Sequence, residues 1–150
     1  MSTSLKEFEN CVFESFKRQG LTDVQAKIFA YLHTVSEPVT FATIAKQTKY
    51  SLPSVSLAIK FLHLQQMITL EREPGSKKFL VSLEQNMQDV FISKFRSFLD
   101  HDIALFEKHY PVWLEKNTLS KDEEVILKRH AKQTKQLKSL FKKMLRVLEE

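Results

Sequence analysis

The stretch SLPSVSLAIKFLHL, residues 51–64, has the spacing of an amphipathic helix. Its apolar residues recur every three or four positions, which is helical and not strand periodicity. They are Val55, Ala58, Ile59 and Leu62. Ser51 can cap this helix, and Pro53 fits its first turn, where a missing N–H costs little. The opposite face carries serines and a lysine, so the sequence predicts an outer surface that is small, hydroxylated and positive.

A short helix is predicted directly before this one. Thr40 can cap a helix over 41–48, with Ile44 and Ala45 facing inward. Only a few residues separate that helix from the one that follows Ser51. Two short helices joined in this way form a helix-turn-helix candidate.

Two longer helices are expected nearer the N-terminus, over 4–18 and 22–34. Gly20 lies between them and can take the left-handed conformation that ends a helix. Each helix has a capping-box pair at its start. The pairs are Ser4 with Glu7 and Thr22 with Gln25.

The periodicity changes after the second short helix. MITLERE, residues 67–73, and KKFLVSL, residues 77–83, favour strands, and the PGS between them is a turn sequence. The sequence therefore predicts a two-stranded hairpin with a basic tip. A hairpin directly after a helix-turn-helix gives the element order of a winged helix-turn-helix.

The remaining residues predict long helices. A phenylalanine-rich apolar stripe predicts a helix over 85–109, which we expect Pro111 and the stretch 117–120 to end. A third capping box, from Ser120, opens a helix over 120–148. Its apolar residues follow the three-four rhythm of a coiled-coil-like seam. The seam residues are Leu127, His130, Thr134, Leu137, Phe141, Met144 and Leu148.

The composition is that of a globular chain without a membrane segment. Of its 150 residues, 43% are hydrophobic and 27% are charged. It has no apolar run of about 18 residues and no N-terminal secretory signal pattern. A single cysteine excludes an internal disulfide framework, so we expect a reducing, cytoplasmic location.

The charge is compatible with a nucleic-acid partner. The formal net charge is +5 and the isoelectric point is about 9.3. Residues 21–83 contain seven basic and four acidic residues, the largest relative excess in the chain. A basic surface of this kind is the electrostatic requirement for binding DNA.

Residues 20–83 resemble the winged-helix regulators of the MarR superfamily, most of all the GbsR-like branch. The resemblance rests on LTDVQAKIFAYL, EPVTFATIAKQT, SLPSVSLAIKFLHLQQMI and REPGSKKF. It implies a dimeric transcription regulator whose terminal helices pair, in a group where many members respond to a small ligand.

The sequence departs from the family pattern at several positions. Lys49 and Gln66 stand where glycine is usual, and PGSKK replaces the aspartate-x-arginine wing of many members. Three apolar residues also lie off the buried arc of the helix that follows Ser51. They are Leu57, Phe61 and Leu64.

The outer face of helix 51–64 suits the major groove of DNA. Small residues let a helix backbone approach the bases, and serine hydroxyls can bond to base edges or phosphates. We predict direct contacts from Tyr50, Ser51, Ser54, Ser56 and Lys60. We predict phosphate contacts from Thr40 and Lys49, and wing contacts from Arg72, Lys77 and Lys78. The alternative for these residues is an ordinary solvated surface.

The phenylalanine-rich stripe is either packing or a ligand pocket. By the resemblance, a small effector would bind there, and electron-rich rings suit a quaternary ammonium such as choline. The candidate ligand residues are Phe95, Phe98, Tyr110 and Trp113.

Redox, metal and catalytic chemistry find little support. Cys11 lies where some MarR-type peroxide sensors carry a reactive cysteine, but basic residues are nearly two turns away, and burial in a dimer helix is the competing interpretation. His101 and His109 are too far apart on one helix to be adjacent ligands, and no HExxH or CxxC motif occurs. We predict no metal, no cofactor and no enzymatic activity.

The sequence thus predicts a mainly α fold, a winged helix-turn-helix with a two-stranded wing and long flanking dimerisation helices. We expect an N-terminal dimerisation helix (1–20), a DNA-binding domain (21–83) and a C-terminal dimerisation region (84–150). The predicted function is a sequence-specific regulator, a repressor, that binds double-stranded DNA as a homodimer on a near-palindromic operator. The alternative is a winged-helix module that binds another protein and no specific DNA.

Overall fold

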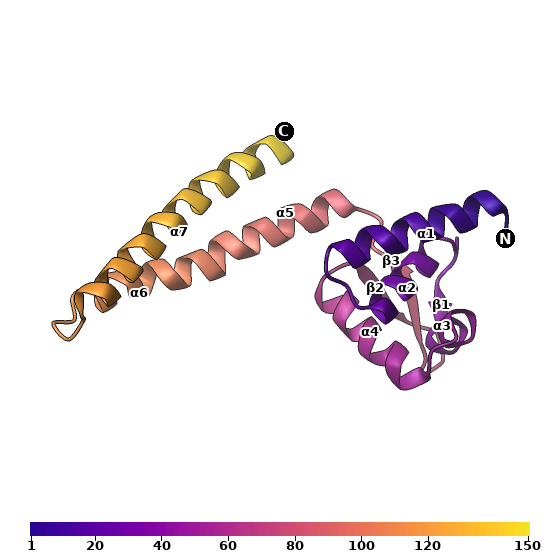
Figure 1. The fold of residues 1–150 in the computed structure, drawn as a ribbon. Coiled ribbons are helices and arrows are strands. Elements are labelled where there is room, and N and C mark those ends of the chain that lie inside the picture. Colours follow the sequence, from indigo (N-terminus) through magenta and orange to yellow (C-terminus); the bar gives the residue numbers. More distant parts are fainter. The chain divides into compact units, whose positions relative to one another are not determined.

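The elements follow the order of a winged helix-turn-helix with flanking helices, which confirms the predicted fold class. The computed structural model describes residues 1–150, which form two units, Met1–Gln85 and Asn86–Glu150 (Figure 1). The first contains α1 (Thr3–Arg18), α2 (Asp23–Leu32), β1 (Val39–Thr40), α3 (Phe41–Thr48), α4 (Leu52–Leu64), β2 (Ile68–Arg72) and β3 (Phe79–Leu83). The second contains α5 (Met87–Ser97), a π-helical segment η1 (Phe98–Ile103), α6 (Ala104–Leu114) and α7 (Lys121–Leu148).

Side-chain caps begin the helices where the sequence predicts, with one exception. The hydroxyls of Thr22, Thr40 and Ser51 each accept the backbone N–H three residues on. The capping box predicted from Ser4 is wrong, because the hydroxyl of Ser2 accepts the N–H of Leu5 and starts α1 earlier. Two serines two residues apart both suit the position, and periodicity alone does not choose between them.

A further capping box starts α7. Ser120 and Glu123 bond reciprocally, as the sequence predicts. The backbone N–H of Ser120, and then its hydroxyl, lower the pKa of the Glu123 carboxyl below its usual value. The charged carboxylate also lies at the positive end of the helix dipole, which favours the helix start.

The core of the first unit lies between α2, α3, α4 and the sheet. The predicted apolar arc of α4 is buried, with Val55, Ile59 and Leu62 at most 1% exposed. It packs against Phe29 on α2 and Ile44 on α3, among other core residues. This packing fixes which side of α4 faces outward.

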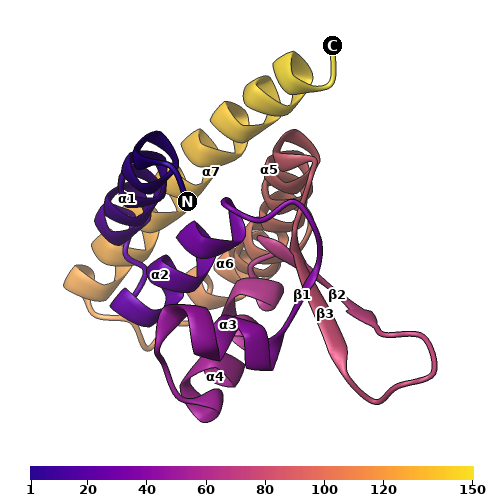
Figure 2. The same cartoon turned by 90° about the vertical axis from the view of Figure 1, so that its right-hand side faces the viewer.

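The wing is a three-stranded sheet and not only a hairpin. β2 and β3 pair antiparallel from Ile68 with Leu83 to Arg72 with Phe79, as the hairpin prediction requires. β1 adds to the other edge of β3, giving the order β1-β3-β2. The sequence analysis missed β1, because two residues are too few to show an alternating pattern. The hairpin extends beyond the helices of its own unit (Figure 2).

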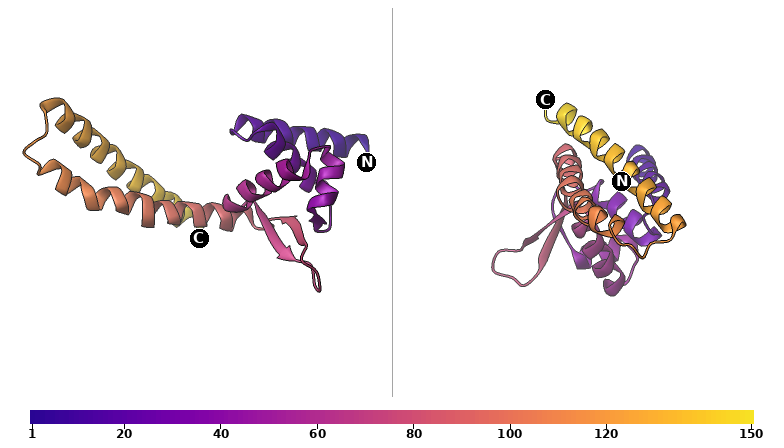
Figure 3. Two further views of the ribbon diagram at one scale, coloured as in Figure 1. Left: turned by 90° about the horizontal axis from the view of Figure 1, so that it is seen from below. Right: turned by 90° about the vertical axis from the view of Figure 1, so that its left-hand side faces the viewer.

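The second unit is a helical hairpin. α5, η1 and α6 follow one another, and α7 runs back beside them in the opposite direction (Figure 3). Gln88 near the start of α5 donates to the carbonyl of Leu148, and Lys138 binds Glu107 on α6. The first bond joins the two arms at the open end of the hairpin, and the second joins them along its length.

The helix that was expected to end near residue 109 continues through Pro111 to Leu114. Proline removes one helical hydrogen bond, a local cost that packing can offset. Tyr110, directly before it, is 7% exposed, and its hydroxyl bonds to Thr134 at 2.9 Å and to His130. These bonds to α7 hold this turn of α6 in place.

A nearly buried ion pair joins α1 to α2 in the first unit. Lys27 Nζ lies 2.8 Å from the carboxylate of Glu9, whose side chain is 10% exposed. A second pair, Lys17 with Asp23, also joins this region, but the Asp23 side chain is 71% exposed. Desolvation makes the loss of a partner costly only for the buried carboxylate.

We therefore expect Lys27→Ala to lower the free energy of unfolding by about 1–2 kcal/mol, because it removes the partner of the Glu9 carboxylate, which is only 10% exposed. Lys17→Ala removes the same charge and serves as the control, with an expected change within about 0.5 kcal/mol. Urea unfolding of the full chain, followed by far-ultraviolet circular dichroism, measures both. Equal changes in the two variants would contradict the assignment of Glu9 as the sensitive partner.

Candidate nucleic-acid interface

The outer arc of α4 is exposed and carries no acidic residue. Ser56, Leu57 and Lys60 all face solvent. The absence of acid extends well beyond the helix, because no aspartate or glutamate occurs between Pro38 and Leu70. A surface that approaches phosphates at close range needs this, since each carboxylate would be repelled.

The first turn of α4 uses its hydroxyls partly for capping. Ser51 and Ser54 bond to each other at 2.9 Å, and Ser51 accepts the N–H of Ser54. Tyr50 is half-buried and packs on the core. Of the five predicted direct contacts, Ser56 and Lys60 are therefore the exposed side chains that no cap or core contact engages.

The turn between α3 and α4 is held in an unusual backbone conformation. Lys49 ends α3 with φ 61°, in the left-handed region, and its side chain is exposed. Gln66, which follows α4, has φ 58°. These are the two positions where the MarR resemblance leads one to expect glycine. The chain keeps the glycine geometry at both, at the conformational cost that a non-glycine residue bears there.

The wing carries its basic residues at and beside the tip. Glu73 donates its N–H to the carbonyl of Lys78 at 2.9 Å, which closes the turn. Lys77 and Lys78 are exposed. The guanidinium of Arg72 lies 5.8 Å from the centre of the Phe79 ring, in a cation–π contact. Phe79 therefore holds Arg72 beside the β3 strand.

A cavity of about 300 Å³ lies between the start of α3, the start of α4 and the wing. The predicted contacts Thr40, Lys77 and Lys78 line it. The sequence analysis missed its other lining residues, which are Phe41, Ala42, Leu52 and Phe79. The outward position of Phe79 on a predicted strand was the available indication, but only the fold brings the wing beside α3.

The four predicted ligand residues belong to the α5–η1–α6 arm and form two aromatic groups along it. Phe95 and Phe98 both contact Phe141, with ring centres 5.0 Å apart in each case. Tyr110 and Trp113 contact each other edge to face at 5.9 Å, near His130. Phe95, Phe98 and Tyr110 pack against α7, and a ligand role for the four rings stays a prediction.

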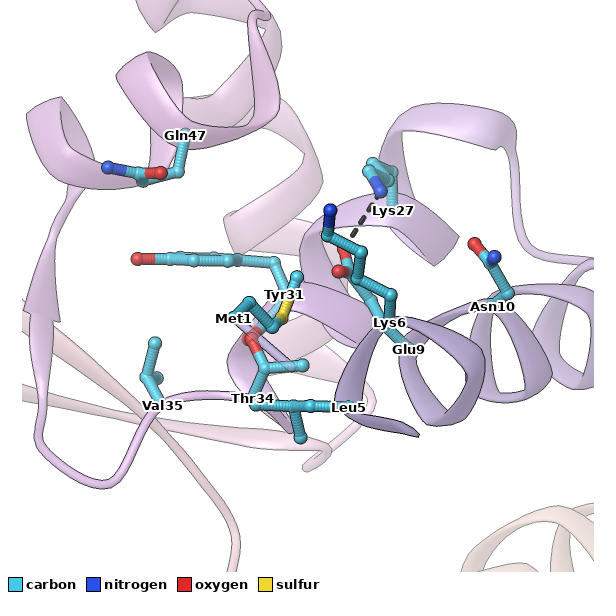
Figure 4. Close-up of a pocket in the computed structure, with 10 residues that line it drawn as sticks. All are labelled: Met1, Leu5, Lys6, Glu9, Asn10, Lys27, Tyr31, Thr34, Val35 and Gln47. Atoms are coloured by element: carbon cyan, nitrogen blue, oxygen red, sulfur yellow. Dashed lines mark hydrogen bonds and ion pairs between the residues drawn. The ribbon is translucent and has the colours of Figure 1, made fainter. Parts of the chain in front are cut away.

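A polar hollow of about 650 Å³ lies beside α1 in the first unit (Figure 4). Lys6 and the Glu9–Lys27 pair line one side of it, and the Tyr31 ring extends between Gln47 and Val35 (Figure 4). Burial raises the pKa of the Tyr31 phenol above its usual value, and the charge of Glu9 raises it further. The sequence analysis did not identify this hollow, because its residues come from three helices and a loop.

Three further observations concern a membrane segment, a metal site and the single cysteine. No helix is long and apolar enough to span a membrane. No group of three or more histidine, cysteine or acidic side chains is placed to hold a metal ion. Cys11 is exposed on α1, so its expected burial stays a prediction about a dimer.

Comparison with solved structures supports the fold. A crystal structure of a transcriptional regulator matches with a TM-score of 0.74 and 14% identity, over 97% of this chain and 93% of that one. MepR, a transcription regulator of the Staphylococcus aureus multidrug efflux pump MepA, matches with a TM-score of 0.45 and 19% identity, over 93% of this chain and 99% of its own. A MepR mutant bound to an oligodeoxyribonucleotide matches with a TM-score of 0.46 and 20% identity, over 90% and 91%.

These structural neighbours are transcriptional regulators and not enzymes. No family model matches the sequence, and no curated protein matches it significantly. At 14% identity, the first likeness shows that this chain shares the fold of that regulator. What the chain binds has to be argued from its own residues.

Lys49 and Gln66, the two non-glycine residues with positive φ, allow an effect on stability to be distinguished from an effect on DNA binding. We expect Lys49→Gly and Gln66→Gly each to raise the free energy of unfolding by about 0.5–1 kcal/mol, because glycine relieves the strain at positive φ. Only Lys49→Gly should weaken DNA binding, since Lys49 is a predicted phosphate contact. Urea unfolding and fluorescence anisotropy measure the two effects. If both variants bind DNA like the wild type, Lys49 is not a phosphate contact.

Proposed function

We propose that this chain is a dimeric, sequence-specific DNA-binding transcription regulator of the MarR superfamily, in its GbsR-like branch, and that it acts as a repressor. The observation that carries the proposal is the exposed arc of α4 with Ser56 and Lys60, in a segment from Pro38 to Leu70 that has no acidic residue, followed by a wing with Lys77 and Lys78 exposed at its tip. The fold shared with a transcriptional regulator supports it.

In this proposal α4 enters the major groove with its N-terminal half nearest the bases. Lys60 and Ser56 are then placed for base edges or phosphates. The cavity between α3 and the wing takes the DNA backbone. Its apolar wall suits a deoxyribose, and Lys77 and Lys78 suit the adjoining phosphates.

The proposed dimer uses an outward seam on α7. The predicted seam combines residues from two neighbouring faces of α7. One set faces the α5–α6 arm, and the other is exposed. Leu127, Thr134, Phe141 and Leu148 face the α5–α6 arm, whereas Leu137 and Met144 are 43% and 37% exposed. With these two, a second set repeats by four and three along the outer face. It consists of Ile126, Gln133, Leu137, Leu140, Met144 and Val147, all exposed, whereas His130, at the remaining position of this repeat, bonds to Tyr110 on α6.

Charge determines how two such helices can pair. Between Val125 and Leu148 the helix has eight lysine and arginine residues and no acidic residue, while Asp122, Glu123 and Glu124 lie in its first turn. A parallel pair would place acid beside acid in the first turn and base beside base along the rest of the helix. An antiparallel pair places each acidic first turn beside the basic end of the other copy, so we propose antiparallel pairing.

A small-molecule effector completes the proposal, in the class that the MarR resemblance implies. It would bind the aromatic residues of the second unit and change the spacing of the two DNA-binding units, not their contacts. Three of these rings, Phe95, Phe98 and Tyr110, pack on α7, which is how a bound ligand would alter the hairpin.

The binding proposal is tested by selecting duplexes from a random pool and from the gene's own upstream region with the full-length protein. Anisotropy should show an affinity for the selected duplex about 10³-fold or more above a scrambled one. Lys60→Ala should weaken and relax that preference. Lys77→Ala should weaken binding to all duplexes and reduce the salt dependence by about one ion per half-site.

Lys116→Ala is the matched control, because it removes an exposed lysine from the loop between α6 and α7. It should leave the preference unchanged. Weak, equal binding to selected and scrambled duplexes would overturn the DNA proposal. It would favour the alternative, a winged-helix module that binds another protein, in which Lys60→Ala and Lys77→Ala leave function intact.

The dimer proposal is tested by Leu140→Glu, which places a carboxylate in the middle of the outward seam. We expect dimer dissociation to become at least about 100-fold easier, because burial of an unpaired charge costs several kcal/mol. Ser139→Glu adds the same charge one residue away, off both seams, and should leave the dimer intact. Light scattering coupled to gel filtration measures both. A dimer that survives Leu140→Glu does not use this seam.

A further inference from the structure

We infer that Leu57 contacts the 5-methyl group of a thymine in the major groove and makes the protein select that base. The inference rests on the proposed DNA binding and names a residue that determines its specificity. Leu57 is 72% exposed, although leucine is among the residue types most often buried. No core, cap or hairpin contact in the chain accounts for it.

The position of Leu57 on α4 places it at the centre of the proposed interface. Counting outward residues by four, three and four gives Pro53, Leu57, Lys60 and Leu64, directly opposite the buried arc. Leu57 lies in the second turn, beside Ser56 and one turn before Lys60. The N-terminal half of a recognition helix is the part that reaches the base edges.

The chemical groups in the major groove determine which base can make an apolar contact with Leu57. Donors and acceptors line the major groove, and the C5-methyl of thymine is its apolar group. An exposed leucine in the second turn, with Ser56 and Lys60 as polar neighbours, therefore gains most from a thymine. Lys60 and Ser56 supply the polar contacts around it.

A second copy of this chain is a poorer occupant of the same surface. Two α4 faces brought together would place Lys60 near its counterpart. No acid between Pro38 and Leu70 is available to neutralise the pair. DNA offers a phosphate charge to Lys60 and a thymine methyl group to Leu57.

Removal of single methyl groups from the operator tests the inference. In the selected duplex, each symmetric pair of thymines is replaced in turn by deoxyuridine, which lacks only the 5-methyl group. For the wild type, one position should lose about fourfold in affinity per half-site, the worth of about one buried methyl, or about fifteenfold for both. At that position the loss of affinity caused by deoxyuridine should fall below about twofold per half-site in Leu57→Ala.

Two variants control for the substitution itself. Leu64→Ala removes a leucine that is 70% exposed in the last turn of α4, and it should keep the full uracil penalty. Leu57→Met retains an apolar side chain and should keep most of the loss of affinity that deoxyuridine causes. Circular dichroism checks that each variant is folded.

The outcomes separate this inference from the function on which it rests. A specific duplex without a thymine in its half-sites, or a uracil penalty that Leu57→Ala leaves unchanged, overturns the role of Leu57 and leaves the DNA proposal standing. A selection that returns no specific duplex overturns the DNA proposal, and the inference about Leu57 is then abandoned with it.

Discussion

Burial of one arc of α4 is the constraint on which the rest of the first unit depends. Val55, Ile59 and Leu62 lose essentially all contact with solvent against α2, α3 and the sheet. Deleting buried methyl groups of this kind usually costs 2–5 kcal/mol per leucine or isoleucine, so the helix has little freedom to rotate. Because the inner arc is fixed, the outer arc is fixed too. The exposed serine, leucine and lysine on α4 are therefore presented in one geometry.

The two backbone turns that flank α4 reinforce this geometry. Lys49 and Gln66 both adopt left-handed conformations, one directly before the helix and one directly after it. The strain at such residues persists only where the surrounding packing determines the backbone. At Lys49 the strained residue also presents a basic side chain beside α4. Stability and the proposed interface thus compete at one position, which is a common pattern at functional sites.

Local chemistry accounts for the parts of the fold that the sequence predicted. Caps from Thr22, Thr40 and Ser51 and the PGS turn act within a few residues, so their positions follow from the sequence alone. The features that were missed depend on distant residues. β1 exists because β3 offers it an edge, and α6 continues through Pro111 beside bonds from Tyr110 to α7.

The candidate site divides in the same way. Ser56, Lys60, Lys77 and Lys78 were identified from residue type and order, and the structure leaves them exposed. Phe41, Leu52 and Phe79 were not, because only the fold brings the wing beside α3. On α7 two neighbouring rows of residues both repeat every three or four positions. Periodicity alone could not show which row faces the α5–α6 arm and which faces outward.

In the proposed function DNA binds to α4 and the wing, and not to another basic surface. The strongest competing surface is α7, with its eight basic residues. Hydrogen–deuterium exchange by mass spectrometry, on the full-length protein with and without the selected duplex, distinguishes them directly. If α4 and the wing bind DNA, peptides that cover 49–64 and 72–79 will exchange more slowly with DNA present, and exchange on the exposed face of α7 will not change. Protection of α7 alone, with α4 and the wing unaffected, would contradict it.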